Sequence, residues 1–173
     1  QERLEDCINS DLANNYGNLC QRVFSFIKKN CDNKIPVSKK KSNIDNKLLD
    51  NLYNNIPNLI ELMNKQNLNE YIKIVVNFSF EANKYFNDSE PWAVKKKDPE
   101  RMNTILNTII HQIKNISILL YPIIPSSIIK VLNTINLEMK DIKISNIQNY
   151  DILNHNTELK NLEILFKKIE NDN

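Results

Sequence analysis

Residues 87–102 read NDSEPWAVKKKDPERM and mark the place where one predicted helix ends and the next begins. Pro91 ends the first of them, because a proline pushes the residue before it out of the α region. Asp98 and Pro99 predict a new start, with an N-cap side chain followed by a proline at the first helical position. Between the two helices lies Trp92, the only tryptophan of the chain, just ahead of the lysines at 95–97.

On both sides of this stretch, apolar residues recur every three or four positions, which is the period of an amphipathic helix. The pattern predicts helices over 3–30, from an Asp45 cap to about 63 with a kink at Pro57, over 68–86, over 99–120 and over 126–135. The single glycine argues against β-hairpins, whose tight turns need residues that tolerate positive φ. We therefore expect an all-α fold, an antiparallel helical bundle of about five helices joined by short loops.

The last part of the chain gives a weaker signal. In the fifth helix, Ile128, Ile129 and Leu132 are expected to face inward. The segment LKNLEILFKKIE at 159–170 fits a sixth helix or an extended segment, and we favour an irregular or extended tail. The expected organisation is a bundle at 1–136 and a tail at 137–173, which packs back on the bundle or on a catalytic domain outside this chain.

Composition excludes several classes of protein. No run of eighteen apolar residues occurs among the 173, so we expect no membrane partner. The N-terminus lacks the apolar core of a secretory signal, and three cysteines fit neither a disulfide framework nor a zinc site, so we expect a cytoplasmic protein without a metal. The first residue is Gln and not Met, which suggests a piece of a longer chain.

Charge is unevenly distributed although the net charge is only +2. Residues 20–41 carry seven basic side chains and one acidic side chain, a local charge of +6 that leaves −4 for the rest. Such a surface can attract a polyanion, whereas an ordinary solvated loop would look the same in sequence.

Catalytic chemistry is not indicated. One glycine cannot build a phosphate-binding loop, and neither His111 nor His155 is spaced for catalysis with a Ser, a Cys or a pair of carboxylates. The chain therefore looks like a binding module.

Three side chains are candidates for reading an unpaired base. Asn18 and Arg22 are four residues apart, hence on one helix face, and their amide and guanidinium groups can hydrogen-bond a base edge. Trp92 offers a flat face for base stacking, and Lys95 and Lys96 can hold nearby phosphates. The residues alone leave an alternative open, in which Asn18 and Arg22 face water and Trp92 plugs the end of the bundle.

Three stretches resemble the anticodon-binding domain of bacterial and organellar methionyl-tRNA synthetases. They are INSDLANNYGNLCQRVFSFIKKNCDNKIP at 8–36, EANKYFNDSEPWAVKKKDPERM at 81–102 and LLYPIIPSSIIKVLNTI at 119–135. The resemblance covers 1–136 and extends faintly to LFKKIE at 165–170, which lacks the family's proline. Pro57 is a second departure, inside a helix expected to be continuous.

The resemblance implies that Asn18 and Arg22 contact bases of the CAU anticodon of methionine tRNA and that Trp92 stacks on the first base. Pro91 would fix the approach of the tryptophan, while Asn83 and Tyr85 would brace the third helix against the first. Lys95 and Lys96 would lie near the phosphates of the same loop.

The family also implies what lies outside the chain. The expected partners are the anticodon loop of methionine tRNA and an N-terminal catalytic domain of the same polypeptide, which uses ATP. No cofactor, no catalytic residue and no DNA partner are expected here. The alternatives are a helical protein-interaction module, or the equivalent domain of an isoleucine, valine or leucine ligase.

Overall fold

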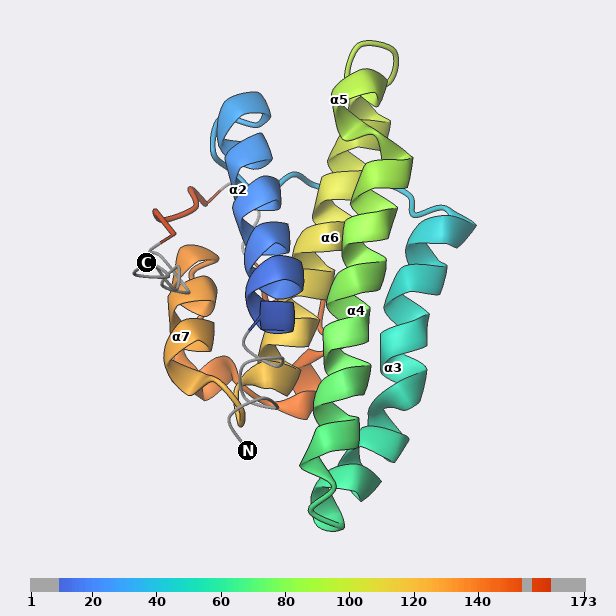
Figure 1. The fold of residues 1–173 in the computed structure, drawn as a ribbon. Helices are drawn as coiled ribbons and strands as arrows, with labels where there is room; N and C mark the ends of the chain where they lie inside the picture. Colours follow the sequence, from blue (N-terminus) through green and yellow to red (C-terminus); the bar gives the residue numbers. More distant parts are fainter. Residues whose placement is uncertain (1–9, 154–156, 163–173) are drawn as a thin grey trace, which may run out of the picture.

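The computed structural model describes residues 10–153 and 157–162, and this part of the chain is an antiparallel helical bundle (Figure 1). The all-α prediction is confirmed. In order, the helices are the π-helical turn η1 (Leu12–Gly17), α2 (Asn18–Asn30), α3 (Asn43–Asn64), α4 (Leu68–Ser89), α5 (Pro91–Val94), α6 (Pro99–Leu120) and α7 (Pro125–Thr134), followed by the 3₁₀ turns η2 (Met139–Asp141) and η3 (Ile144–Asn146).

Helix α6 is the centre of the bundle. Its residues from Thr104 to Leu120 are all buried, and α2, α3, α4 and α7 pack around it (Figure 1). The hydroxyls of Thr108 and Ser117 bond the backbone carbonyls four residues earlier, which satisfies them inside the apolar core. A helix that is buried on all sides fixes the relative positions of the helices around it.

The first predicted helix has two parts. From Leu12 to Gly17 the backbone is π-helical, and regular α-helix begins at Asn18. The Tyr16 hydroxyl lies 2.7 Å from the hydroxyl of Ser117 on α6, which anchors this turn to the centre of the bundle. The predicted start at residues 3–9 lies outside the described residues.

The start of α3 corrects one prediction. Ser42, and not Asp45, occupies the N-cap position. Asp45 is the third residue of the helix, and its carboxylate accepts hydrogen bonds from the Ser42 backbone N–H at 2.8 Å and hydroxyl at 3.1 Å. The helix then continues through Pro57 to Asn64.

The connection between α4 and α6 follows the prediction closely. Helix α4 ends at Ser89, directly before Glu90 and Pro91, and the Asp98 side chain caps α6 by accepting from the Arg101 N–H at 3.0 Å. The segment between them is not a simple loop, because residues 91–94 form the helical turn α5.

The chain after α6 folds back along the bundle. In α7, Ile128 and Leu132 are buried, but Ile129 is 40% exposed, so the inward placement of Ile129 is wrong. Residues 157–162 are not helical; Leu159 N–H donates to the Asn33 carbonyl at 2.8 Å, and Lys34 and Glu158 form a β-bridge. This agrees with an extended tail, whereas LFKKIE lies outside the described residues.

The domain limits at 136 and 137 remain a prediction. Among the described residues, no helix is long and apolar enough to cross a membrane.

Candidate nucleic-acid interface

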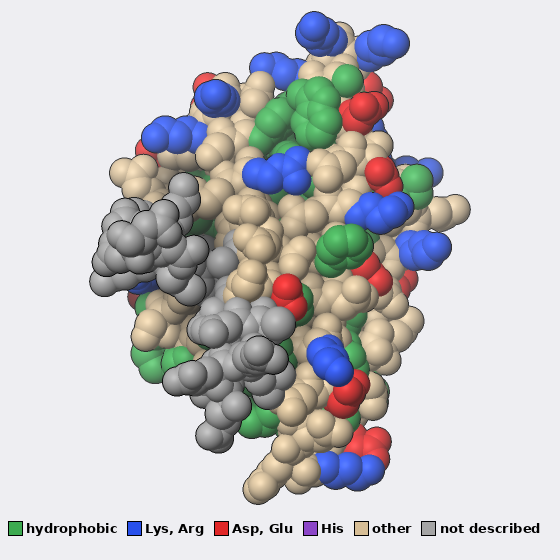
Figure 2. Space-filling model, viewed as in Figure 1, with side chains coloured by type: hydrophobic (Ala, Val, Ile, Leu, Met, Phe, Trp, Pro, Cys, Tyr) green, Lys and Arg blue, Asp and Glu red, His purple; other side chains and the backbone are tan. Residues whose placement is uncertain are grey.

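One face of the bundle combines hydrophobic and basic side chains at the end that carries α5. In Figure 2 a hydrophobic patch lies there over α2, α4 and α5, with Lys and Arg side chains around it. Arg22 of α2 and Trp92 of α5 meet here through Phe86. These three residues, Asn18 one turn before Arg22 and the lysines at 95–97 are called the α5-end surface.

Arg22 is held in one orientation by α4. Its guanidinium donates to the Asn83 side-chain oxygen at 3.3 Å and to the Asn87 side-chain oxygen at 2.5 Å. Asn83 is fixed in turn, because its amide donates to the Asn15 carbonyl at 2.8 Å. Both acceptors of Arg22 are neutral amides, so these bonds orient the guanidinium without neutralising it.

Phe86 joins Arg22 to Trp92. The Arg22 guanidinium carbon lies 5.0 Å from the centre of the Phe86 ring, and the Trp92 ring lies 5.7 Å from it with an angle of 68° between the planes. Phe86 itself is buried and packs edge-on against Phe26 of α2. One buried ring thus positions both the candidate arginine and the candidate tryptophan.

Trp92 is only partly buried, with 44% of its surface exposed. A tryptophan that plugged the end of the bundle would be covered, since full burial is what makes so large a side chain stabilising. The ring contact with Phe86 is edge-to-face, so Phe86 occupies no more than one face of the indole. This arrangement favours the stacking interpretation over the plug.

The backbone of α5 holds the tryptophan in place. Glu90 has left-handed angles, φ 44° and ψ 58°, which reverse the chain at the end of α4. Pro91 follows as the buried first residue of α5, where its fixed φ suits a helix start. The N–H groups of Ala93 and Val94 donate to the Glu90 carbonyl at 2.9 and 3.0 Å, so Trp92 lies on a hydrogen-bonded turn.

Asn18 and the lysines extend the surface on two sides. Asn18 is exposed on α2, one turn before Arg22. Lys95 donates to the Asn30 side-chain oxygen at 2.8 Å and thereby ties α5 to the end of α2. Lys96 and Lys97 are exposed.

The basic stretch at 20–41 is less concentrated in space than its sequence suggested. Lys39 pairs with Glu100 at 2.7 Å, and Lys41 donates to the Asn107 side chain at 2.9 Å, both on α6. These two lysines therefore fasten the loop before α3 to the central helix.

A partly buried ion pair between α3 and α6 was not predicted. Arg101 donates to both carboxylate oxygens of Asp45 at 2.6 and 2.9 Å, and the Tyr85 hydroxyl donates to the same carboxylate at 2.5 Å. Burial raises the pKa of Asp45, but the hydrogen bonds from Arg101, Tyr85 and Ser42 outweigh it, and the pKa lies below its usual value. Burial and the carboxylate beside it raise the pKa of Tyr85.

The ion pair joins the starts of α3 and α6 to the end of α4. The Tyr85 hydroxyl therefore ties α4 to α3, whereas the expected contact with the first helix is made by Asn83, which bonds η1 and α2. The spacing of Ser42 and Asp45 indicates a helix start in the sequence. It does not indicate that Arg101, 56 residues later, pairs with Asp45.

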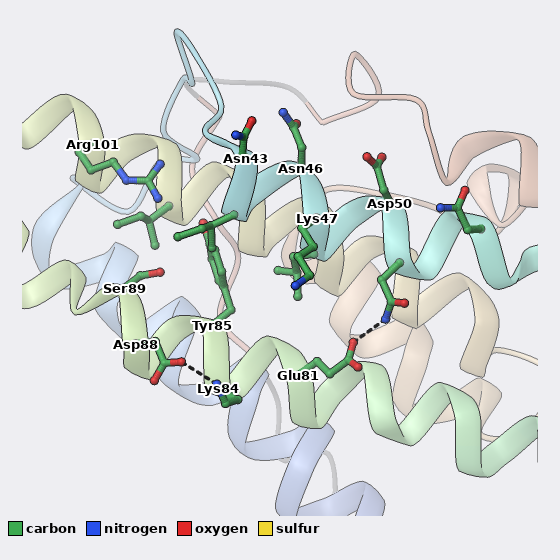
Figure 3. Close-up of a pocket in the computed structure, with 15 residues that line it drawn as sticks. Asn43, Asn46, Lys47, Asp50, Glu81, Lys84, Tyr85, Asp88, Ser89 and Arg101 are labelled. Atoms are coloured by element: carbon green, nitrogen blue, oxygen red, sulfur yellow. Dashed lines mark hydrogen bonds and ion pairs between the residues drawn. The ribbon is translucent and has the colours of Figure 1, made fainter.

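A wide groove lies between α3 and α4. It measures about 970 Å³ and carries both signs of charge, with Lys47, Lys84 and Arg101 near Asp50, Glu81 and Asp88 (Figure 3). Lys84 is paired with Asp88 at 3.0 Å. Because its charges are balanced, this groove offers a polyanion little net attraction.

The side chains that could ligate a metal are dispersed in the described residues. No cluster of three or more His, Cys, Asp or Glu side chains there could hold a metal ion. His111 is buried in α6 with its ring 4.9 Å from that of Tyr150, and His155 lies outside the described residues.

Known proteins share both the sequence and the fold. Residues 35–173 match the family described as the anticodon binding domain of methionyl tRNA ligase. The methionine–tRNA ligase of Thermotoga maritima is 31% identical over 171 residues, which cover 98% of this chain and 27% of that protein, and the one of Rickettsia felis is 32% identical over 95% of this chain and 33% of its own length.

A solved structure agrees with these relatives. Mycobacterium tuberculosis methionyl-tRNA synthetase in complex with methionyl-adenylate superposes with a TM-score of 0.85 and 25% identity, over 96% of this chain and 33% of that one. The chain thus spans about a quarter to a third of the length of the proteins it matches. On the family match and on the fold, this chain belongs to the anticodon-binding domains of the methionyl-tRNA ligases.

Proposed function

We propose that the α5-end surface binds the anticodon loop of methionine tRNA, so that the ligase carrying this domain selects its tRNA. The observation that supports this most is the shared ring of Phe86, which holds a half-exposed tryptophan and an oriented arginine side by side. Both groups are the kind that recognises unpaired bases, one by stacking and the other by hydrogen bonds.

Each side chain then has a distinct role. Trp92 stacks on the first base of the CAU anticodon, and Asn18 and Arg22 bond base edges from α2. Arg22 can do so because its acceptors Asn83 and Asn87 leave its charge uncompensated. Lys95 and Lys96 attract the phosphates, and Pro91 fixes the position of Trp92.

The rest of the proposed activity belongs to a longer polypeptide. The relatives are methionine–tRNA ligases three to four times as long as the match, so we assign ATP use and the attachment of methionine to an N-terminal catalytic domain. This domain contributes tRNA selection and no cofactor, and we place the whole enzyme in the cytoplasm.

Replacing Trp92 by alanine tests the proposal. Loss of one base stack is expected to weaken binding of a methionine tRNA anticodon stem-loop by roughly 1–3 kcal/mol, while thermal unfolding changes little because the side chain is not core. Tyr53→Ala is a matched control, since Tyr53 on α3 is 43% exposed. If Trp92→Ala unfolds the domain and the folded fraction binds normally, Trp92 is a plug.

Arg22→Ala tests base reading separately from stacking. We expect the variant to lose preference for CAU over a scrambled loop, by roughly 1–3 kcal/mol for one bidentate contact. Full preference for CAU in this variant would remove Arg22 from base recognition. Equal binding of both loops by the unmodified chain would point instead to a protein-interaction module.

A further inference from the structure

Phe80 on α4 is the most exposed aromatic side chain of the described residues, at 58%. A single exposed apolar residue is common on protein surfaces and by itself indicates nothing. Phe80 is of interest because of where it lies relative to Asn83 and Asn87, the two residues that hold Arg22.

Phe80, Asn83 and Asn87 lie on one face of α4. Seven residues of α-helix turn through nearly two full turns, so Phe80 and Asn87 differ by only about 20° around the axis and by about 10 Å along it. Asn83 and Asn87 are the two acceptors of the Arg22 guanidinium. Phe80 therefore continues the line of Trp92 and Arg22 along α4, one turn beyond Asn83.

A second apolar area lies along α4 (Figure 2). In Figure 2 a smaller hydrophobic patch lies over α4, separate from the patch at the α5 end and on the same face of the molecule. Asn83 on this face also contacts the turn η1, because its amide donates to the Asn15 carbonyl. A single strand that passes Trp92 and Arg22 can follow α4 toward Phe80 without leaving this face.

The spacing suits single-stranded RNA. Phe86, whose ring contacts Trp92, lies roughly 9 Å along α4 from Phe80, which is the rise of about three nucleotides at 3.4 Å each. We propose that Phe80 is a second stacking platform, which takes another unpaired base of the same loop that Trp92 binds. The inference rests on the proposed function, because it assumes that RNA occupies the α5-end surface.

The interaction at Phe80 is expected to be stacking and not charge attraction. Lys84, one turn further along α4, is paired with Asp88, and Glu81 accepts hydrogen bonds from Asn51 and Asn77. Because Phe80 is uncharged, replacing it removes no phosphate contact and should lower the affinity by the same factor at low and high salt.

Titration of the 173-residue chain with a methionine tRNA anticodon stem-loop tests the inference. Phe80→Ala is expected to bind roughly 5- to 150-fold more weakly, the range for loss of one base–aromatic stack, with an unchanged salt slope. Phe80→Trp should bind at least as well as the unmodified chain, and Phe80→Leu, which is apolar but has no π-face, should behave like Phe80→Ala. Tyr53→Ala again serves as the control for loss of an exposed aromatic residue.

The outcomes separate this inference from the function on which it rests. If Phe80→Ala binds normally while Trp92→Ala binds weakly, Phe80 is not a platform and the proposed function stands. If neither variant weakens binding, both fail. If Phe80→Leu restores the affinity that Phe80→Ala loses, the contact is merely apolar and stacking is refuted.

Photocrosslinking gives the position of the base. With 5-iodouridine placed at each unpaired position of the loop in turn, we expect one position to crosslink to Trp92 and a different one to Phe80. No crosslink to the peptide that contains Phe80 from any position would overturn the inference.

Discussion

Two arginines in this domain are held in similar ways but by acceptors of different charge. Arg101 is fixed by the two oxygens of the Asp45 carboxylate, and Arg22 by the amide oxygens of Asn83 and Asn87. The carboxylate neutralises its arginine inside the bundle, whereas the amides orient theirs and leave its charge available. The comparison suggests that the first pair stabilises the fold and the second prepares a surface for an anion.

The largest expected effect is a loss of stability when the Asp45 carboxylate, the partner of Arg101, is replaced by a neutral amide. Asp45→Asn removes the counterion of Arg101, whose side chain is 27% exposed, and loss of hydrogen bonds to a charged group costs about 1.5–3 kcal/mol. Urea unfolding measures this loss. Glu100→Gln, which breaks the exposed pair with Lys39, is the control and should change stability by less than about 1 kcal/mol.

The same pair predicts how stability responds to acid. Since the pKa of Asp45 is lowered in the folded state, its contribution is complete above the unfolded value of about 3.9 and is lost as pH falls through the folded value. Asp45→Asn should lack this part of the acid response. A similar stability of both proteins at neutral pH would show that the pair is not structural.

Replacing an amide acceptor of Arg22 by a carboxylate would give Arg22 the same kind of partner that Asp45 provides for Arg101. Asn87→Asp keeps the shape of the side chain but adds a carboxylate 2.5 Å from the guanidinium, which should weaken anticodon stem-loop binding by about 1–2 kcal/mol through neutralisation and repulsion of phosphates. Stability should not decrease. Asn87→Ala removes the acceptor without adding charge and should bind more tightly than Asn87→Asp; the reverse order would show that orientation matters more than charge.

Lys114 is a third basic residue, with neutral acceptors, and it lies inside the bundle. Its ammonium donates to the carbonyls of Asn146, Ile147 and Asn149 at 2.8, 3.2 and 2.9 Å, and burial lowers its pKa to about 7. An unfolded lysine keeps its proton well above pH 7 while the folded one releases it. Stability should therefore rise from pH 7 to 8, by up to about 1.4 kcal/mol.

Lys114→Met should lack this rise, as measured by urea unfolding at both pH values. Both measurements stay below about pH 8.5, the pH at which cysteine thiols ionise in the unfolded chain. Burial raises the pKa of Cys31 in the folded chain to about 11, so at higher pH the ionisation of this thiol would lower stability and oppose the rise caused by Lys114. Equal slopes for the two proteins would mean that Lys114 keeps its proton throughout.

The smallest effect is expected at the edge of the α5-end surface. Lys96 is exposed, so Lys96→Ala should weaken binding of every RNA by a similar small factor and lower the salt slope by about 0.7, the value for one phosphate contact with a single strand. Loss of CAU preference in this variant would contradict a role in phosphate attraction alone.

Local signals predicted the helices well. Pro91 and the pair Asp98 and Pro99 act through their own backbone geometry, so the end of α4 and the start of α6 could be placed within a few residues. The N-cap is Ser42 and not the predicted Asp45, because both residues of a capping box are typical of helix starts; α5 has only four residues, too few for an apolar period.

Contacts between distant residues could not be predicted in the same way. The four-residue spacing of Asn83 and Asn87 shows that they share a face of α4, but not that the face meets Arg22 61 and 65 residues earlier. Ile129 fits the apolar period of α7 and is still exposed, since the period does not show how far neighbouring elements cover a helix. The resemblance to a known family named Trp92 and Arg22, but Phe86, which joins them, became visible only in the fold.

Glu90 is one of several residues that adopt left-handed backbone angles in this chain although they are not glycine. All the positive-φ positions of the described residues are occupied by residues other than glycine, namely Asp32, Asn33, Gln66, Glu90 and Asn136. The only glycine, Gly17, is helical, with φ −61°. Asn and Asp tolerate the left-handed region better than most residues, which suits a chain so rich in asparagine. In the described residues, the number of glycines therefore underestimates the number of left-handed positions, because these are filled by asparagine, aspartate, glutamine and glutamate.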